Sequence, residues 1–163
     1  MTPGAPPPAP VARAELLIRK PVEEVFEAFV NPDITTKFWF THSTGRLCEA
    51  QRVTWEWRMF GFRSDVKVLE LEQDRRILMD WGKPGKATRV EWTFLSRDGA
   101  TTVAVNHRGF DGDRAQQVAA AIDATEGFTL VLAGAKAWLE HGLRLNLVVD
   151  RHPDAVTQGA HVG

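Results

Sequence analysis

The longest apolar pattern in the chain runs from about Asp123 to Leu147 and predicts one long amphipathic helix. Its apolar positions recur every three or four residues and fall on one face: Phe128, Val131, Leu132, Ala135, Trp138, Leu139 and Leu143. Lys136, Glu140 and Arg144 are each four residues apart, and we expect them on the opposite, solvated face. A helix of roughly 20 residues is about 30 Å long, so this stripe needs an apolar partner of similar length.

The sequence around the start of this helix indicates where it begins. Asp123 and Glu126 have the spacing of a capping box, in which each side chain bonds the backbone of the other end of the first turn. The alanine-rich segment 113–122 favours a separate, shorter helix, and we expect Gly127 to bend the junction. Pro153 lies just beyond the expected end of the long helix.

Short elements are predicted before residue 45. Residues 11–19 form a first strand, and Pro21 then takes the first position of a helix, where proline is tolerated. This helix ends near Asn31, because the residue before Pro32 disfavours helical geometry. Pro32 opens a second short helix that leads to an aromatic cluster, and residues 41–45 are predicted as a loop. The cluster consists of Phe38, Trp39 and Phe40.

From Arg46 onward the hydrophobic period changes to two, which predicts β-strands. The alternating residues are Val53, Trp55, Trp57 and Met59, then Val66 and Val68, then Ile77, Met79 and Trp81, then Val90, Trp92 and Phe94, and finally Val103, Val105 and His107. Asp98 and Gly99 are typical of a tight hairpin turn. Parallel neighbours would need crossovers of a dozen or more residues, so we predict an antiparallel meander. The fold class is α+β, with a curved sheet of about six to seven strands around the long C-terminal helix.

Composition indicates a single domain. With 163 residues and 44% hydrophobic content, the chain can bury one good core but not two. We expect residues 1–10, which hold five of the nine prolines, to be a disordered leader, residues 11–153 to form the domain, and residues 154–163 to be a flexible tail.

Charge and cysteine content limit which binding partners and which cellular location we expect. The formal net charge is -1 and the pI is near 6.5, which favours neither nucleic acid nor an anionic membrane surface. The sequence contains no run of about 18 consecutive apolar residues, so it does not predict a membrane span. The single cysteine, Cys48, cannot form an intrachain disulfide, and residues 1–10 do not resemble a secretory signal. We therefore expect a cytoplasmic protein.

The aromatic content is the main functional indication, because six tryptophans and nine phenylalanines occur without any tyrosine. Many of the apolar residues on the inward phase could line a cavity between sheet and helix, as in small-molecule sites. The predicted ligand-binding residues are Trp39, Trp55, Trp57, Met79, Trp81, Trp92, Phe94, His107, Phe128, Leu132 and Ala135. The alternative is that they fill an ordinary core. Several inward indoles favour a cavity, because each N–H needs a partner that a ligand or water supplies more easily than a dry core.

His107 is the one ionisable side chain on the inward phase of a strand. It could orient a polar ligand group or transfer a proton, or it could be a hydrogen-bonded histidine of the core or rim. No carboxylate or nucleophile has a spacing that assigns it a catalytic role. The outer face of the first helix carries Glu23, Glu24 and Glu27, and we expect these carboxylates to form a solvated surface. No two histidines have metal-ligand spacing, so we predict no catalytic residue, metal or cofactor.

Two stretches carry a family resemblance that covers roughly residues 12 to 153. They are RKPVEEVFEAFVNPDITTKFW, residues 19–39, and TEGFTLVLAGAKAWLEHGLRLNLVVDRHPD, residues 125–154. With the order of elements, they resemble the helix-grip, START-like superfamily of lipid-transfer domains, polyketide cyclases and the birch pollen allergen. Within it, the chain most resembles the family named for the activator of the Hsp90 ATPase. The resemblance implies a hydrophobic cavity between helix and sheet, and it is compatible with a homodimer and a role in stress response.

Three functions follow as hypotheses. The first is binding of a small hydrophobic or aromatic molecule, such as a lipid or polyketide, in the predicted cavity. The second, implied by the resemblance alone, is a co-chaperone-like interaction with an Hsp90-type chaperone. The third is a cyclase or hydrolase that uses the cavity, with His107 as acid or base. We favour binding over catalysis, because the long helix carries no inward-facing catalytic group.

Overall fold

The computed structural model describes residues 4–157 of the chain. In chain order, its elements are β1 (Ala12–Ile18), α1 (Val22–Val30), α2 (Pro32–Thr35), β2 (His42–Ser43), β3 (Arg52–Trp57), the 3-10 turn η1 (Arg58–Phe60), β4 (Phe62–Glu72), β5 (Arg76–Trp81), β6 (Thr88–Arg97), β7 (Ala100–Arg108), α3 (Arg114–His141), α4 (Leu147–Arg151) and the 3-10 turn η2 (Pro153–Ala155). The outer parts of the predicted leader and tail, residues 1–3 and 158–163, lie outside the described residues.

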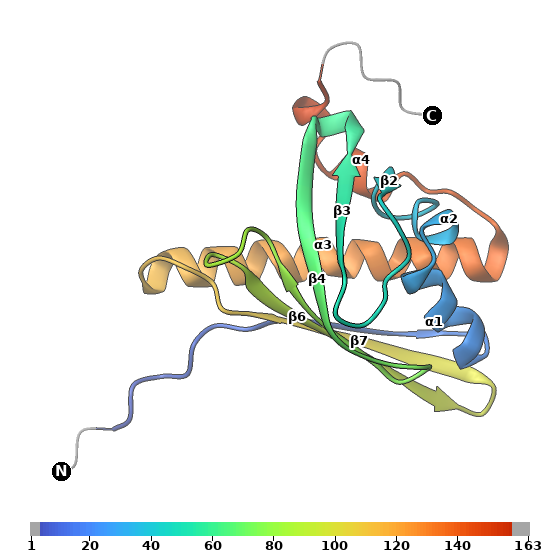
Figure 1. The fold of residues 1–163 in the computed structure, drawn as a ribbon, viewed down its shortest axis with the longest axis horizontal. Coiled ribbons are helices and arrows are strands. Elements are labelled where there is room, and N and C mark those ends of the chain that lie inside the picture. Colours follow the sequence, from blue (N-terminus) through green and yellow to red (C-terminus); the bar gives the residue numbers. More distant parts are fainter. Residues whose placement is uncertain (1–3, 158–163) are drawn as a thin grey trace.

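The strands form one antiparallel sheet in the order β1-β7-β6-β5-β4-β3-β2. Figure 1 shows α3 crossing the molecule lengthwise, with β6 and β7 running along one side and β3 and β4 rising past it. The sheet therefore curves around the helix. A β-bulge between Val68 and Glu70 interrupts the pairing of β4 with β5, and bulges increase local bend and twist. The predicted α+β class and the helix-on-sheet architecture are confirmed.

The hairpin predicted at Asp98-Gly99 is present between β6 and β7. Both residues have positive φ, 49° and 81° respectively, which is the geometry of a primed two-residue turn. Strand alternation is also as predicted in β3, where Val53, Trp55 and Trp57 are buried and their neighbours are not. Met59 departs from that prediction. It is buried but belongs to η1, because the chain leaves the strand after Trp57 and turns through Gly61 at φ 62°.

The predicted bounds of the long helix were wrong at both ends. A single helix starts at Arg114 and continues through Gly127, so there is neither a separate leading helix nor a bend there. The capping box uses Asp113 and Gln116 instead of Asp123 and Glu126, and both of its reciprocal hydrogen bonds are present. The helix ends at His141, because Gly142 adopts the left-handed conformation that closes the last turn. Residues 147–151 form the separate helix α4.

Lys136 and Glu140 do not lie on a freely solvated face, as was predicted. The Glu140 side chain is only 10% exposed and accepts hydrogen bonds from the Arg19 N–H at 2.8 Å and from Lys136 Nζ at 2.6 Å. Lys136 Nζ also donates to the Leu17 carbonyl at 2.8 Å. Burial alone would raise the pKa of Glu140, but the bonds from Arg19 and Lys136 hold it below its ordinary value. The pair therefore ties α3 to the end of β1.

Residues 41–45 and Arg144 also differ from their predictions. Residues 41–45 are not wholly loop, because β2 pairs with β3 through His42 and Ser43. Arg144 lies beyond α3 and donates to the Thr36 carbonyl at 2.8 Å. Of the predicted tail, the described residues 154–157 reach back to η1, where the Thr157 N–H donates to the Met59 carbonyl at 2.8 Å.

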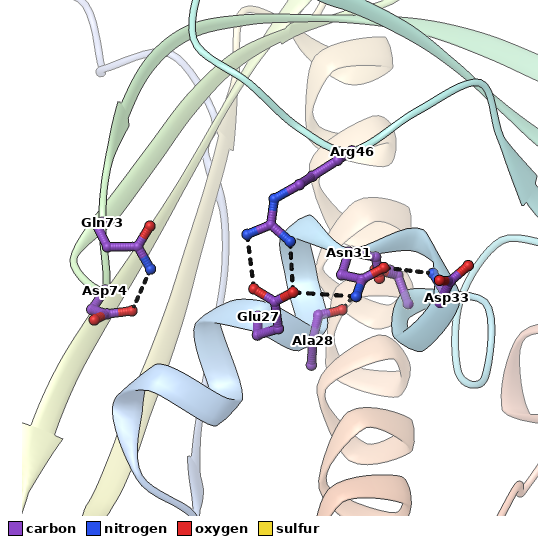
Figure 2. Close-up of polar contacts among 8 residues, drawn as sticks. Glu27, Ala28, Asn31, Asp33, Arg46, Gln73 and Asp74 are labelled. Carbon is purple, nitrogen blue, oxygen red and sulfur yellow. Dashed lines mark hydrogen bonds and ion pairs between the residues drawn. The ribbon is translucent and has the colours of Figure 1, made fainter.

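An exposed ion pair joins α1 to the loop before β3. Nη1 and Nη2 of Arg46 donate to the two carboxylate oxygens of Glu27 at 2.6 and 2.8 Å (Figure 2). The hydrogen bond from Arg46 is the main cause that holds the pKa of Glu27 below its ordinary value. Asn31 donates to the same carboxylate, and its Oδ1 accepts from the Asp33 N–H to cap α2. Glu27 thus has a structural role.

The core lies between the concave side of the sheet and α3. From α3 it receives Phe128, Val131, Leu132 and Ala135, all at most 5% exposed. By length and composition alone, α3 could cross a membrane. In this fold its apolar stripe instead packs against the sheet, chiefly along β1.

We predict that Leu132→Ala lowers the free energy of unfolding by about 2–5 kcal/mol, because the side chain is completely buried and its loss leaves a cavity. Ile122→Ala on the same helix is the matched control. Its side chain is 64% exposed, so its effect should stay within about 0.5 kcal/mol. Urea unfolding of both variants measures the difference. Equal losses would contradict the assignment of this face of α3 to the core.

Candidate functional site

A cavity of about 240 Å³ lies between α3, the ends of three strands and α4. Trp57 closes β3, Trp81 closes β5 and His107 lies near the end of β7. The complete lining is Trp39, Trp57, Trp81, His107, Asp123, Ala124, Gly127, Phe128, Leu130, Val131, Val148, Arg151 and His152. The site is thus near one end of the curved sheet rather than along its whole length.

Five of the predicted ligand-binding residues line this cavity: Trp39, Trp57, Trp81, His107 and Phe128. Three of their rings are nearly parallel. The Trp81 ring is 6.1 Å from that of Trp57, at an angle of 10°, and 5.8 Å from that of His107, at 16°. The Phe128 ring meets those of Trp81 and His107 edge-on, at 5.8 and 5.6 Å. Together these rings make flat and edge-on aromatic walls, suited to a flat apolar molecule.

The other six predicted residues lie in the core and not on the cavity wall. They are Trp55, Met79, Trp92, Phe94, Leu132 and Ala135. Neighbouring aromatic rings fill the space in front of these residues, where the cavity was predicted. Phe40 stacks on Trp55 with centroids 4.7 Å apart, and Phe29 lies 4.9 Å from Trp92. The middle of the sheet is therefore closed by aromatic packing.

His107 is held by a chain of hydrogen bonds. The Thr88 hydroxyl donates to the Trp81 carbonyl at 3.3 Å, and His107 Nε2 lies 2.7 Å from that hydroxyl oxygen. His107 and Thr88 thus share one hydrogen bond, and the tautomer of the ring decides which of the two donates. The other ring nitrogen, Nδ1, is buried without a hydrogen-bond partner. Burial lowers the pKa of His107 to about 4, so the ring is neutral at physiological pH.

Arg151 joins α4 to α3 beside the cavity. Its Nη2 donates to the Asp123 side chain at 2.7 Å and to the Asp123 carbonyl at 3.1 Å, and its Nε donates to Glu126 at 3.2 Å. Gly127 makes this approach possible, because a Cβ there would lie 2.9 Å from Arg151 Nη1. The Arg151 side chain is only 15% exposed. Asp123 and Glu126 are thus partners of Arg151, not a helix cap.

The wall contributed by α4 was missed from the sequence. Val148, Arg151 and His152 follow α3 in a segment without a clear apolar period. Gly127 was the available signal, because an isolated glycine inside a helical pattern often marks a close approach. It was interpreted as a bend instead.

The chemistry of this arrangement favours binding. The cavity wall contains two side chains that are charged at neutral pH, Asp123 and Arg151, and they are paired with each other. In residues 4–157, no group of three or more His, Cys, Asp or Glu side chains could hold a metal ion. The hydrogen bond that holds His107 leads to Thr88, not to a carboxylate. A neutral molecule with a flat apolar body fits such a wall.

We predict that His107 makes stability depend on pH. Above about pH 6.5 the ring is neutral in both the folded and the unfolded chain. As the pH falls from 6.5 to about 4, only the unfolded chain takes up the proton, so the free energy of unfolding should fall by about 3 kcal/mol.

Urea unfolding between pH 4 and 7.5 tests this, with His107→Phe as the variant that removes the titrating ring. The wild-type protein should lose more stability on acidification than the variant does. His141→Gln, a change at an exposed histidine, controls for the loss of a histidine as such. Parallel pH profiles for wild type and His107→Phe would contradict the prediction.

Comparison with solved structures places the fold among known proteins. The protein SSP2350 from Staphylococcus saprophyticus is 25% identical, with a TM-score of 0.72, over 83% of this chain and 95% of that chain. DynU16, from the dynemicin biosynthetic locus, is 21% identical with a TM-score of 0.73, over 84% of this chain and 49% of its own. The Aha1 protein from Colwellia psychrerythraea, solved as a dimer, is 15% identical with a TM-score of 0.70, over 81% and 97% of the two chains.

The family comparison covers most of the chain. No curated protein matches the sequence. The family described as "Activator of Hsp90 ATPase homolog 1-like protein" matches residues 19–140, from the end of β1 to the last turn of α3. This range contains strands β2 to β7, α1, α2 and most of the cavity wall, and it confirms the resemblance seen in the sequence. The chain therefore belongs to the family of activator of Hsp90 ATPase homolog 1-like proteins.

Proposed function

We propose that the protein binds a small, neutral, aromatic or hydrophobic molecule in the cavity beneath α4. The observation that carries this proposal is the aromatic wall formed by Trp39, Trp57, Trp81 and Phe128 around open volume. Large aromatic residues normally fill cores without leaving such space. A polyketide fragment or a lipid ring system has the required chemistry. The cytoplasmic location expected from the sequence remains a prediction.

The size of the cavity limits the ligand. An apolar cavity of about 150 Å³ in another protein holds benzene. On that scale, the 240 Å³ here accommodate roughly ten non-hydrogen atoms. Two fused rings fit this volume, while a larger ligand needs the walls to move.

Catalysis is less well supported than binding. A general acid or base at His107 would need a proton-exchanging partner and a pKa near the working pH. Its Nε2 is engaged by Thr88, its Nδ1 is buried, and its pKa is lowered to about 4. These features describe a histidine that positions and shapes the wall.

We predict that bicyclic aromatic molecules bind saturably and that filling the cavity abolishes the binding. Ala124 lines the cavity, so Ala124→Phe should weaken binding at least about tenfold by occupying the ligand's space. Ala119→Phe, at an exposed position of the same helix that does not line the cavity, is the control and should bind as the wild type does.

Isothermal titration calorimetry and quenching of tryptophan fluorescence measure the affinity, using bicyclic aromatics, lipids, sterols and polyketides as probes. Native mass spectrometry shows whether a ligand is retained from the cell. If no class binds to the wild type, or if Ala124→Phe binds unchanged, the proposal fails.

A protein partner is the second candidate function, and an exposed apolar patch on α3 favours it. The patch consists of Val11, Val118 and Ile122, whose exposed fractions are 38%, 37% and 64%, and it borders a shallow groove with Pro10 and Ala121. Exposed apolar patches mark interaction sites. We propose a second copy of the chain as the occupant; the related Colwellia protein is a dimer.

Light scattering during gel filtration tests this candidate. We expect a concentration-dependent dimer in the wild type and a monomer in Ile122→Asp, because a charge in the patch would lose its water on association. Far-UV circular dichroism checks that the variant is folded. A monomer at all concentrations would contradict the dimer, and a pull-down with an Hsp90-type chaperone then tests the alternative occupant.

A further inference from the structure

The indole N–H groups of the cavity tryptophans have no partner within the protein. Tryptophan can only donate a hydrogen bond. Among residues 4–157, no hydrogen bond comes from an indole nitrogen. The fully enclosed side-chain polar atoms without a partner in this range are His42 Nδ1 and His107 Nδ1, and no indole nitrogen is among them. The indole nitrogens are therefore unpaired and adjoin space that a small molecule can reach.

Trp39, Trp57 and Trp81 all line the cavity, and Trp39 also borders a second pocket next to α4. Trp39 and Trp57 are only 7% and 5% exposed, so they have little contact with bulk solvent. Trp81 is half-buried between Trp57 and His107, which line the cavity with it. An indole N–H that faces the cavity can therefore donate a hydrogen bond to the occupant.

In residues 4–157, no side chain of the wall accepts a hydrogen bond from these donors. The Asp123 carboxylate accepts from Arg151. His107 Nε2 is engaged with Thr88, and its Nδ1 is enclosed. Leaving a buried N–H group unpaired is unfavourable. An occupant of the cavity, either water or a ligand, can supply the missing acceptors.

We propose that the ligand is a flat, neutral, fused-ring aromatic molecule that carries a carbonyl oxygen, and that this oxygen accepts a hydrogen bond from an indole N–H of Trp39, Trp57 or Trp81. This inference rests on the proposed binding function and adds the chemical class of the ligand. The neutral charge follows from Arg151, the one cation on the wall, whose guanidinium already donates to Asp123 and Glu126. The fused rings follow from the volume, and the carbonyl follows from the unpaired donors.

Coumarin and naphthalene are suitable probes, because both are flat bicyclic molecules and only coumarin carries a carbonyl oxygen. Calorimetry should compare their binding to the wild type and to Trp39→Phe, Trp57→Phe and Trp81→Phe. In at least one variant, we expect coumarin to bind about tenfold more weakly and naphthalene to change by less than about twofold. Trp138→Phe is the control, because Trp138 lies under Lys37 and away from the cavity, so both affinities should be unchanged.

The wild-type protein provides a second measurement that does not depend on folding of the variants. In ¹⁵N-labelled protein, addition of coumarin should move the indole N–H proton signal of at least one cavity tryptophan downfield. Addition of naphthalene should not produce this downfield shift.

The possible results separate this inference from the function on which it rests. Equal losses of both probes in every variant, together with no downfield indole shift, would overturn the donor wall while leaving aromatic binding in place. If neither probe binds the wild type, the inference and the proposed function both fail. A coumarin-specific loss in one cavity variant supports the inference and identifies the donor.

Discussion

The side chain of Trp39 fills the space between the curved sheet and α3, and much of the interior is arranged around it. Its ring lies 4.8–6.4 Å from six others, which are those of Phe40, Trp55, Trp57, Trp81, Trp92 and Phe128. A sheet that curves away from a straight helix leaves a wedge that aliphatic side chains do not fill. A large ring supplied from the connection after α2 closes one part of this wedge and leaves the other part open beneath α4. The same residue thus belongs to the core and to the cavity wall.

The sequence predicted the sheet well, because each strand alternates between one buried and one exposed face. The residues of β3 and the Asp98-Gly99 turn follow rules that depend only on local geometry. The start of α3 was harder to locate. Its first two turns are rich in alanine and glutamine and have no apolar stripe, because most side chains at this end of the helix are exposed to solvent. The capping residues, Asp113 and Gln116, were visible in the sequence but were overlooked for a second pair with the same spacing.

The cavity could be predicted only in outline. Period-two patterning shows which tryptophans face inward, but not how much room remains in front of them. That room depends on Phe29 and Phe40, which come from other elements and fill the space before Trp92 and Trp55. The pairing of Arg151 with Asp123 and Glu126 joins residues distant in sequence, and no local pattern contains it. Similarly, a helical wheel places Glu140 on the solvated face of α3, because the wheel does not include the end of β1 that covers this residue.

The contact of Arg151 with α3 also bears on how the cavity exchanges its contents. The sheet walls are locked by ladders of backbone hydrogen bonds, whereas α4 is attached to α3 by side-chain bonds at an edge near solvent. We therefore expect α4 to be the wall of lowest local stability, and ions in solution should weaken its attachment because they screen charge pairs near the surface. The neutral ligand that we propose carries no net charge for such screening to act on. Ionic strength should consequently change the rates of entry and exit together and leave their ratio, the affinity, nearly constant.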